Sequence, residues 1–163
     1  MKGRQHPVSV LHTSLAQGDY NDAALRTFWQ IHTEQEVGDV LIFLPGQEDI
    51  ESLESSIESL SSKITADHMG VLVCPLYAAL PPAAQAAVFE RPPPNTRKVI
   101  LSTNIAETSI TIPGVKFVID TGLCKEKRYF ARGKGNGVDA LLLQPISKSS
   151  ALQRTGRAGR EVR

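Results

Sequence analysis

Five consecutive apolar residues, Val40 to Leu44, end abruptly at Pro45-Gly46. A strand with one solvated face alternates apolar and polar residues, whereas a strand that is buried on both faces is apolar throughout. Pro45 and Gly46 are typical of the turn that follows such a strand. The run therefore predicts a central strand of a parallel sheet with helices on both faces, which is an α/β architecture.

Helical spacing is found on both sides of this strand. Between residues 20 and 33 the apolar residues recur near three- and four-residue steps, as they do on one face of a helix; they are Ala23, Ala24, Phe28 and Ile31. The same spacing returns after Gly46 with glutamates and serines between the apolar positions, which predicts an amphipathic helix; these positions are Ile50, Leu53, Ile57 and Leu60. Further upstream, the alternation of residues 6–12 predicts a short strand that opens the domain.

Three more apolar runs predict buried strands at residues 71–74, 98–101 and 115–119. Prolines begin a short predicted helix at 81–89, between the first two of these runs. At least four buried strands are thus separated by helices or compact loops. This order predicts a mainly parallel sheet with flanking helices.

The stretch after Asp120 breaks the alternation of strands and helices. Residues 123–130 and 138–143 are strand-like, and they flank the turn-prone segment 133–137. The pattern predicts an antiparallel β-hairpin near 123–143 that protrudes from the sheet. We expect its turn to be basic and flexible rather than tight.

Charge is distributed unevenly although the net charge is only +1. Residues 1–120 hold 8 Lys/Arg and 14 Asp/Glu, whereas residues 121–163 hold 10 Lys/Arg and 3 Asp/Glu. The basic end is where polyphosphate or nucleic acid would bind, and a solvated basic surface without a ligand is the alternative. No apolar run approaches the roughly 20 residues that cross a bilayer, so we expect no membrane partner. Cys74 and Cys124 lack metal-ligand spacing, so we expect reduced, buried thiols and no bound metal.

The segment from Gln153 to Arg160, with sequence QRTGRAGR, carries the most specific chemistry. Its three arginines stand at three-residue spacing, and on a helix Arg157 and Arg160 would point together at one anion. A planar guanidinium matches phosphate oxygens better than an ammonium does. A surface arginine cluster and an RNA-binding basic helix are the alternatives.

QRTGRAGR resembles the sixth motif of superfamily-two helicases of the DEAH type. Residues 41–51 resemble the fourth motif of that family, and residues 102–112 resemble its fifth. The resemblance extends from about Asp19 to Glu161. It implies that residues 1–163 form the second, C-terminal RecA-like domain of a DEAH-box ATP-dependent RNA helicase, as a fragment that stops just after QRTGRAGR. Residues 19–32 and the ending QRTGRAGRE, residues 153–161, resemble the ribosome-biogenesis branch more than the splicing branch.

The resemblance implies catalytic roles for three residues. Gln153 matches the glutamine that helps to position the attacking water. Arg157 and Arg160 match the arginines that contact the phosphates, where they would neutralise charge on the transferring phosphoryl group. For Arg154, which would point away from its neighbours, we expect a structural ion pair.

The resemblance also implies a nucleotide-binding wall. Phe89 matches a phenylalanine that stacks on adenine, and Ser109 and Thr111 match positions near the nucleotide. From the residues alone, Phe89 could equally be a core aromatic, and Ser109 and Thr111 could be caps. The family has an acidic residue for the ribose where this chain has Pro113, which offers no side-chain donor or acceptor.

Five residues are expected to bind RNA without reading its sequence. Thr103 follows a strand and matches the family threonine that contacts the RNA backbone. Asn104 stands beside it in the fifth motif, and Gly46 lies in the fourth motif. Lys127 and Arg128 lie on the predicted hairpin, which would act as a wedge between RNA strands.

The chain contains no GxxxxGK[ST] loop and no DEAH box. By resemblance, the first RecA-like domain supplies both, so ATP would lie between the domains and Mg²⁺ would be held mainly by the absent one. The implied function is to couple ATP hydrolysis to RNA translocation or unwinding, with the fragment inactive alone. The implied partners are RNA, the first RecA-like and C-terminal domains of the same protein, and an activating protein; the family favours a nuclear or nucleolar location. The alternative is a non-catalytic RNA-binding or scaffold module.

Overall fold

The computed structural model describes residues 6–64 and 67–159. Its centre is a parallel four-stranded sheet in the order β2-β3-β1-β4. The strands are β1 (Asp39–Phe43), β2 (Gly70–Leu76), β3 (Thr96–Ser102) and β4 (Val115–Asp120). Every residue of β1 is buried, because β1 pairs with a strand on each side and is covered on both faces. The predicted parallel α/β sheet is confirmed.

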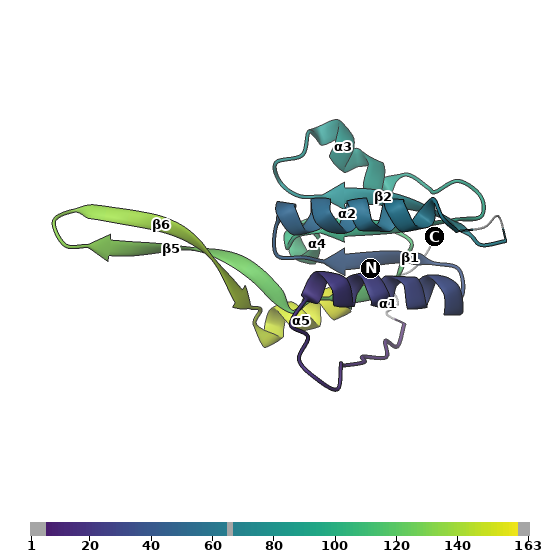
Figure 1. The fold of residues 1–163 in the computed structure, drawn as a ribbon, viewed down its shortest axis with the longest axis horizontal. Coiled ribbons are helices and arrows are strands. Elements are labelled where there is room, and N and C mark those ends of the chain that lie inside the picture. The colour runs from purple at the N-terminus through teal and green to yellow at the C-terminus, as the bar shows by residue number, and fades with distance from the viewer. Residues whose placement is uncertain (1–5, 65–66, 160–163) are drawn as a thin grey trace.

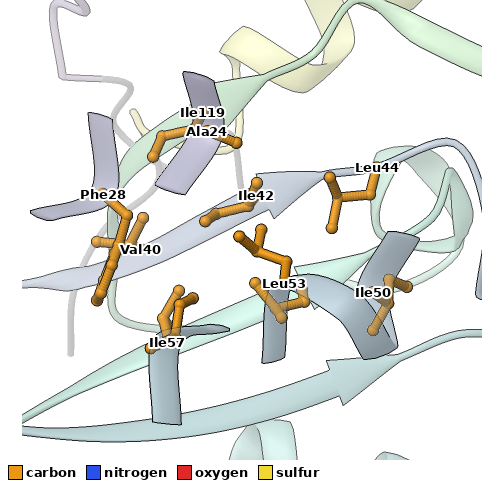
Figure 2. Packing of buried hydrophobic residues seen from close by; sticks show 11 residues of the cluster. Ala24, Phe28, Val40, Ile42, Leu44, Ile50, Leu53, Ile57 and Ile119 are labelled. Atoms are coloured by element: carbon orange, nitrogen blue, oxygen red, sulfur yellow. The ribbon is translucent and has the colours of Figure 1, made fainter. Parts of the chain in front are cut away.

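Two long helices cover one face of the sheet (Figure 1). They are α1 (Tyr20–Glu34) and α2 (Gln47–Ser61), and Asp19 caps the first because its carboxylate accepts a hydrogen bond from the Asp22 amide. Figure 2 shows their apolar side chains pointing toward those of β1. The core cluster on this face includes Ala24, Phe28, Val40, Ile42, Ile50, Leu53 and Ile57. The helical spacing in the sequence therefore identified most of this core correctly, but Ala23 is only half-buried and lies outside the cluster, and Leu60 is exposed.

Shorter elements cover the opposite face. They are α3 (Pro82–Ala86), the 3-10 helix η1 (Ala87–Phe89), α4 (Ile105–Thr108) and α5 (Lys148–Thr155). Their core cluster contains Leu41, Phe43, Leu76, Val88, Ile100 and Ala106. The four-stranded sheet and the helices on both of its faces are together called the body below.

Two sequence predictions about strands are wrong. Residues 6–12 form no strand, because this exposed segment pairs with neither of the two sheets; the His6 amide donates a hydrogen bond to the Gly159 carbonyl at 3.0 Å. The strand predicted as buried at 71–74 is the edge strand β2, in which Leu72 is 39% exposed. An edge strand pairs on one side only, and it tolerates the missing N–H of Pro75 for that reason.

The predicted hairpin exists and is longer than predicted. Strands β5 (Leu123–Arg132) and β6 (Asn136–Pro145) pair antiparallel and project from the body (Figure 1). Arg132 pairs with Asn136, so the turn between them has only three residues. Lys134 and Gly135 adopt positive φ angles of 76° and 79°. The expectation of a loose turn is therefore wrong, since this backbone closes the strands tightly. The hairpin is called the arm below.

Over the described ranges, no helix is long and apolar enough to cross a membrane. Both cysteines are free thiols, but only Cys74 is buried, and Cys124 is half-buried at the base of the arm. Burial raises the pKa of both thiols, so they remain protonated near neutral pH.

Candidate functional site

Two of the predicted RNA-binding loops meet where the parallel strands end. Gly46 follows β1, and Thr103 and Asn104 follow β3, its neighbour in the sheet. The Leu44 amide donates to the Ser102 carbonyl at 2.8 Å, which ties the two loops together. Ligands of open α/β sheets bind at this edge. Gly46 is buried, Thr103 is half-buried and Asn104 is exposed.

An open groove of about 550 Å³ lies between the start of α2 and the base of the arm. Its lining includes Gly46, Glu51, Lys125 and Leu141. A Cβ atom at Gly46 would stand 2.8 Å from the Lys125 Nζ, so Lys125 lies directly against this glycine, and a larger residue would make the flexible lysine side chain shift. Lys125 shares this lining with the carboxylates of Glu48 and Glu51, so the groove carries charges of both signs.

Arg154 is enclosed by the body rather than presented to a ligand. Its side chain is 1% exposed, its Nε donates to the Glu107 carboxylate at 3.0 Å, and its NH1 donates to Asp120 at 2.9 Å. The guanidinium also lies 4.7 Å from the centre of the Phe43 ring. The predicted structural ion pair is present, and it fastens α5 to α4, β4 and β1.

Arg157 lies beyond the end of its helix. Helix α5 ends at Thr155 with Gly156 as its C-cap, so Arg157 does not stand on the helical face that the spacing predicted for it and Arg160. The Arg157 NH1 donates to the Ile110 carbonyl at 3.1 Å and to the Thr111 hydroxyl at 3.4 Å, and its NH2 donates to the Glu107 carbonyl. The geometry therefore locks the sixth motif onto the fifth. Arg160 lies outside the described residues.

The remaining nucleotide candidates stand on different elements. Thr111 is brought to Arg157, while Ser109 is exposed at the C-cap of α4 and Gln153 is exposed on α5. Phe89 ends η1, on the side of the sheet next to β2, and its side chain is 47% exposed. The reading of Phe89 as an ordinary core residue is wrong, because Val88 beside it fills the core instead.

The two arm candidates are engaged within the arm. Lys127 forms an ion pair with Asp139 at 2.7 Å, and Arg128 donates to the Gln144 side chain at 3.0 Å. Both basic residues remain exposed. They can therefore face phosphates without leaving their partners.

Sequence reasoning missed the acids that organise this region. Glu107 and Asp120 both accept from Arg154, and Asp39 lies inside the body beside Lys98. Burial raises the pKa of the Asp39 carboxyl, and the nearby Lys98 charge opposes that shift. The sequence signal that could have identified these acids is a charged residue inside an apolar segment or at its end.

Comparison with known proteins tests the resemblance. The helicase conserved C-terminal domain matches residues 21–161. The chain belongs to this family. It is 48% identical over 162 residues to the human ATP-dependent RNA helicase DHX33, covering 99% of this chain and 22% of that protein. It is 47% identical over 161 residues to the Arabidopsis thaliana pre-mRNA-splicing factor ATP-dependent RNA helicase DEAH10, with the same coverage.

The fold agrees with the family. The crystal structure of the Escherichia coli DExH-box NTPase HrpB matches with a TM-score of 0.79 and 38% identity, over 98% of this chain and 19% of that one. A second HrpB structure, described as a DEAH/RHA helicase, gives a TM-score of 0.77. The chain is thus a helicase C-terminal domain of the DEAH type with a RecA-like fold. It spans about a fifth of the length of these relatives.

Proposed function

We propose that residues 1–163 form the second RecA-like domain of an ATP-dependent RNA helicase and supply one wall of its ATP site. The other wall, with the phosphate loop and the metal-holding acid, would come from a first RecA-like domain. In this arrangement Arg160 faces the phosphates, and Arg157, which is 7% exposed, reaches them when its guanidinium exchanges the Glu107 and Ile110 carbonyls for phosphate oxygens. Gln153 orients the attacking water, and Phe89 stacks on the base. Ser109 and Thr111 border the nucleotide, and Pro113 leaves the ribose to other groups.

One observation carries this proposal: a single short segment joins the two candidate sites. It begins at Thr103 and Asn104, beside the strand ends where RNA would lie, and it ends at Thr111, which Arg157 holds. Closure of the two domains on ATP would press on Arg157 and shift this segment, which changes the grip on the RNA backbone. Fixed guanidinium groups stabilise the charge that develops on the transferring phosphoryl group.

The RNA side of the proposal rests on groups that do not read bases. Gly46, Thr103 and Asn104 offer amides and a hydroxyl to phosphate oxygens, and Lys127 and Arg128 offer charge along the arm. We assign no Mg²⁺ ligand to this chain. In the described residues no three His, Cys, Asp or Glu side chains are grouped so that they could hold a metal ion.

The test is ATP hydrolysis with and without RNA, measured for the chain joined to a first RecA-like domain and for residues 1–163 alone. The joined protein should hydrolyse ATP faster when RNA is added, and the isolated chain should show no turnover above background. RNA-stimulated turnover by residues 1–163 alone would contradict the two-wall arrangement. RNA binding without turnover in the joined protein would favour the non-catalytic module instead.

The branch assignment is a further part of the proposal. We infer a role in ribosome biogenesis from the resemblance at residues 19–32 and 153–161. Depletion of the full-length protein should then perturb ribosomal RNA maturation before it perturbs splicing, and RNA sequencing after depletion measures both.

A further inference from the structure

Two buried cations lie side by side in β3. Arg97 and Lys98 are 1% and 2% exposed, although the rest of the strand is apolar or small. Successive residues of a strand face opposite sides of the sheet, so the two cations contact elements on opposite faces of the sheet. A lysine is almost never fully buried unless it is paired. Each of these side chains therefore has structural partners that account for its burial.

Lys98 grips the backbone on both sides of Phe89. Its Nζ donates to the Val88 carbonyl at 2.7 Å and to the Glu90 carbonyl at 2.8 Å. The same ammonium lies 3.8 Å from the Asp39 carboxylate. The three donors of an ammonium are thus directed at two carbonyls and one acid.

The segment that Lys98 holds is a short turn. η1 has three residues, and such short 3-10 turns have poor hydrogen-bond geometry. Val88 is fully buried and anchors the turn from below, while the Phe89 ring stands out toward solvent. The direction of the ring then depends on the backbone at residues 88 and 90, which is where the ammonium acts.

Asp39 keeps the ammonium in place from the neighbouring strand β1. One carboxylate oxygen accepts from the Lys98 amide at 3.3 Å, and the other faces the Nζ. The contacts form one chain, from Asp39 through Lys98 to the two carbonyls that flank Phe89.

We propose that Lys98 is a positioning residue that presents the Phe89 ring to the nucleobase. The proposal rests on the proposed function, in which Phe89 stacks on adenine. An aromatic ring contributes stacking energy only when its plane is offered to the base, so a turn that is free to rotate loses affinity for the nucleotide. Lys98 would thereby tune ATP binding without touching ATP.

Arg97 provides a matched control. It donates to the carbonyls of Gly38 at 2.6 Å, Glu36 at 2.9 Å and Gln35 at 3.2 Å, and it lies 5.6 Å from the centre of the Phe117 ring. It is as buried as Lys98, sits on the same strand, and also holds backbone carbonyls. Its partners follow the end of α1, however, and none of them flanks Phe89.

The experiment compares Lys98→Met, Arg97→Met and Phe89→Ala in the full-length protein that contains the first RecA-like domain. Two quantities are measured beside thermal stability: the KM for ATP, and the fluorescence quenching of a 2-aminopurine riboside triphosphate, which reports stacking on the base. Lys98→Met should raise the KM about tenfold, as the loss of one well-made contact does, while kcat stays within about twofold. It should also relieve the quenching as Phe89→Ala does.

Arg97→Met should lower the melting temperature but leave the KM and the quenching at the parent values. The double variant Lys98→Met/Phe89→Ala should have the KM of Phe89→Ala alone, because Lys98 acts through the ring. Equal effects of Lys98→Met and Arg97→Met on KM and quenching would overturn the proposal. If Lys98→Met does not fold, Lys98→Gln, which retains an amide donor, is judged by the same two readouts.

The failure of this inference differs from the failure of the proposed function. If Phe89→Ala raises the KM and relieves the quenching but Lys98→Met does neither, only the positioning role of Lys98 is overturned. If Phe89→Ala itself changes neither readout, Phe89 does not stack on the base. That result overturns both the proposed stacking of Phe89 and the positioning role of Lys98.

Discussion

Several charged side chains are buried in the body, whereas charged and apolar side chains alike are exposed in the arm. In the body, Arg97, Lys98 and Arg154 are almost free of solvent, and each holds several carbonyls or carboxylates. In the arm, the Lys127 and Asp139 pair is exposed, and apolar side chains such as Tyr129 and Leu141 are 64% and 68% exposed. A lone two-stranded hairpin is marginally stable in water. The difference indicates that contacts inside the body hold its charged side chains, whereas the side chains of the arm face outward, where a partner can contact them.

The largest expected effect concerns turnover, which the proposed function assigns to the sixth motif, residues 153–160, and not to the arm. In the full-length protein, Arg160→Ala should lower kcat by about 10³-fold, because an arginine that stabilises the transferring phosphoryl group contributes that much. RNA affinity should remain close to the parent value. Steady-state ATPase assays and RNA-binding titrations measure the two quantities.

Arg26→Ala is the matched control for this change. Arg26 is an exposed arginine on α1 that pairs with Asp22 at 2.9 Å, outside both candidate sites. Its variant should keep the parent kcat. A loss of RNA affinity with unchanged kcat in Arg160→Ala would move Arg160 to the RNA site and weaken the division between body and arm.

The next largest effect concerns stability. Arg154→Met removes the partner of two carboxylates inside the body, which should cost about 3 kcal/mol of the free energy of unfolding, the low end for a broken buried pair. Lys127→Met removes an exposed pair of the arm and should cost no more than about 1 kcal/mol. Urea denaturation of the two variants and the parent measures the difference. Similar losses in both variants would mean that the arm is as tightly integrated as the body.

A smaller effect is expected from shortening the tip of the arm, residues 133–137, which comprises the three-residue turn and the first two residues of β6. If the arm parts RNA strands, unwinding by the full-length protein should fall about tenfold, which corresponds to about 1.4 kcal/mol of barrier. ATP turnover with RNA and the melting temperature should stay near the parent values, because the turn contributes nothing to the core of the body. Strand-separation, ATPase and thermal denaturation assays are run on the same preparation. Parallel losses in all three would show a packed structural hairpin instead of a wedge.

The body was predictable because its elements follow from local patterns. The apolar run at β1 and the three- and four-residue spacing in α1 and α2 depend on the burial of one face or two, which the sequence records directly. The arm was predictable as a hairpin because strand-like segments flank a glycine-rich turn. The tightness of that turn was not, since it depends on positive φ angles at Lys134 and Gly135.

The site was only partly predictable for a physical reason. A pattern shows which residue types occur together but not which atoms meet across the fold. Arg154 was expected to form an ion pair, yet its acids, Glu107 and Asp120, are 47 and 34 positions away in sequence. Arg157 lies outside the helix because α5 ends at Thr155, which the three-residue spacing of the arginines did not indicate. The strand predicted at residues 6–12 failed because alternation alone does not supply a partner strand.

The smallest expected effect is a response of the body to mild acid through His32. This side chain is buried against Phe28 and Trp29, and its Nε2 lies 2.9 Å from the Met69 carbonyl. A carbonyl only accepts, so the Nε2 carries a proton in this contact. Burial lowers the pKa of His32; the Met69 carbonyl opposes this shift, and the Arg97 charge adds to it.

The sign of the effect follows from the lowered pKa. Above the ordinary histidine value of about 6.5, His32 is neutral in the folded and unfolded states, and its packing contributes fully to stability. Below that value the unfolded chain takes up a proton that the folded body resists, so the free energy of unfolding falls as the pH falls. His32→Gln keeps a donor for the Met69 carbonyl but cannot titrate, so its stability should fall less between pH 8 and pH 5.5. An equal slope in His32→Gln and the parent would place the acid response elsewhere in the body.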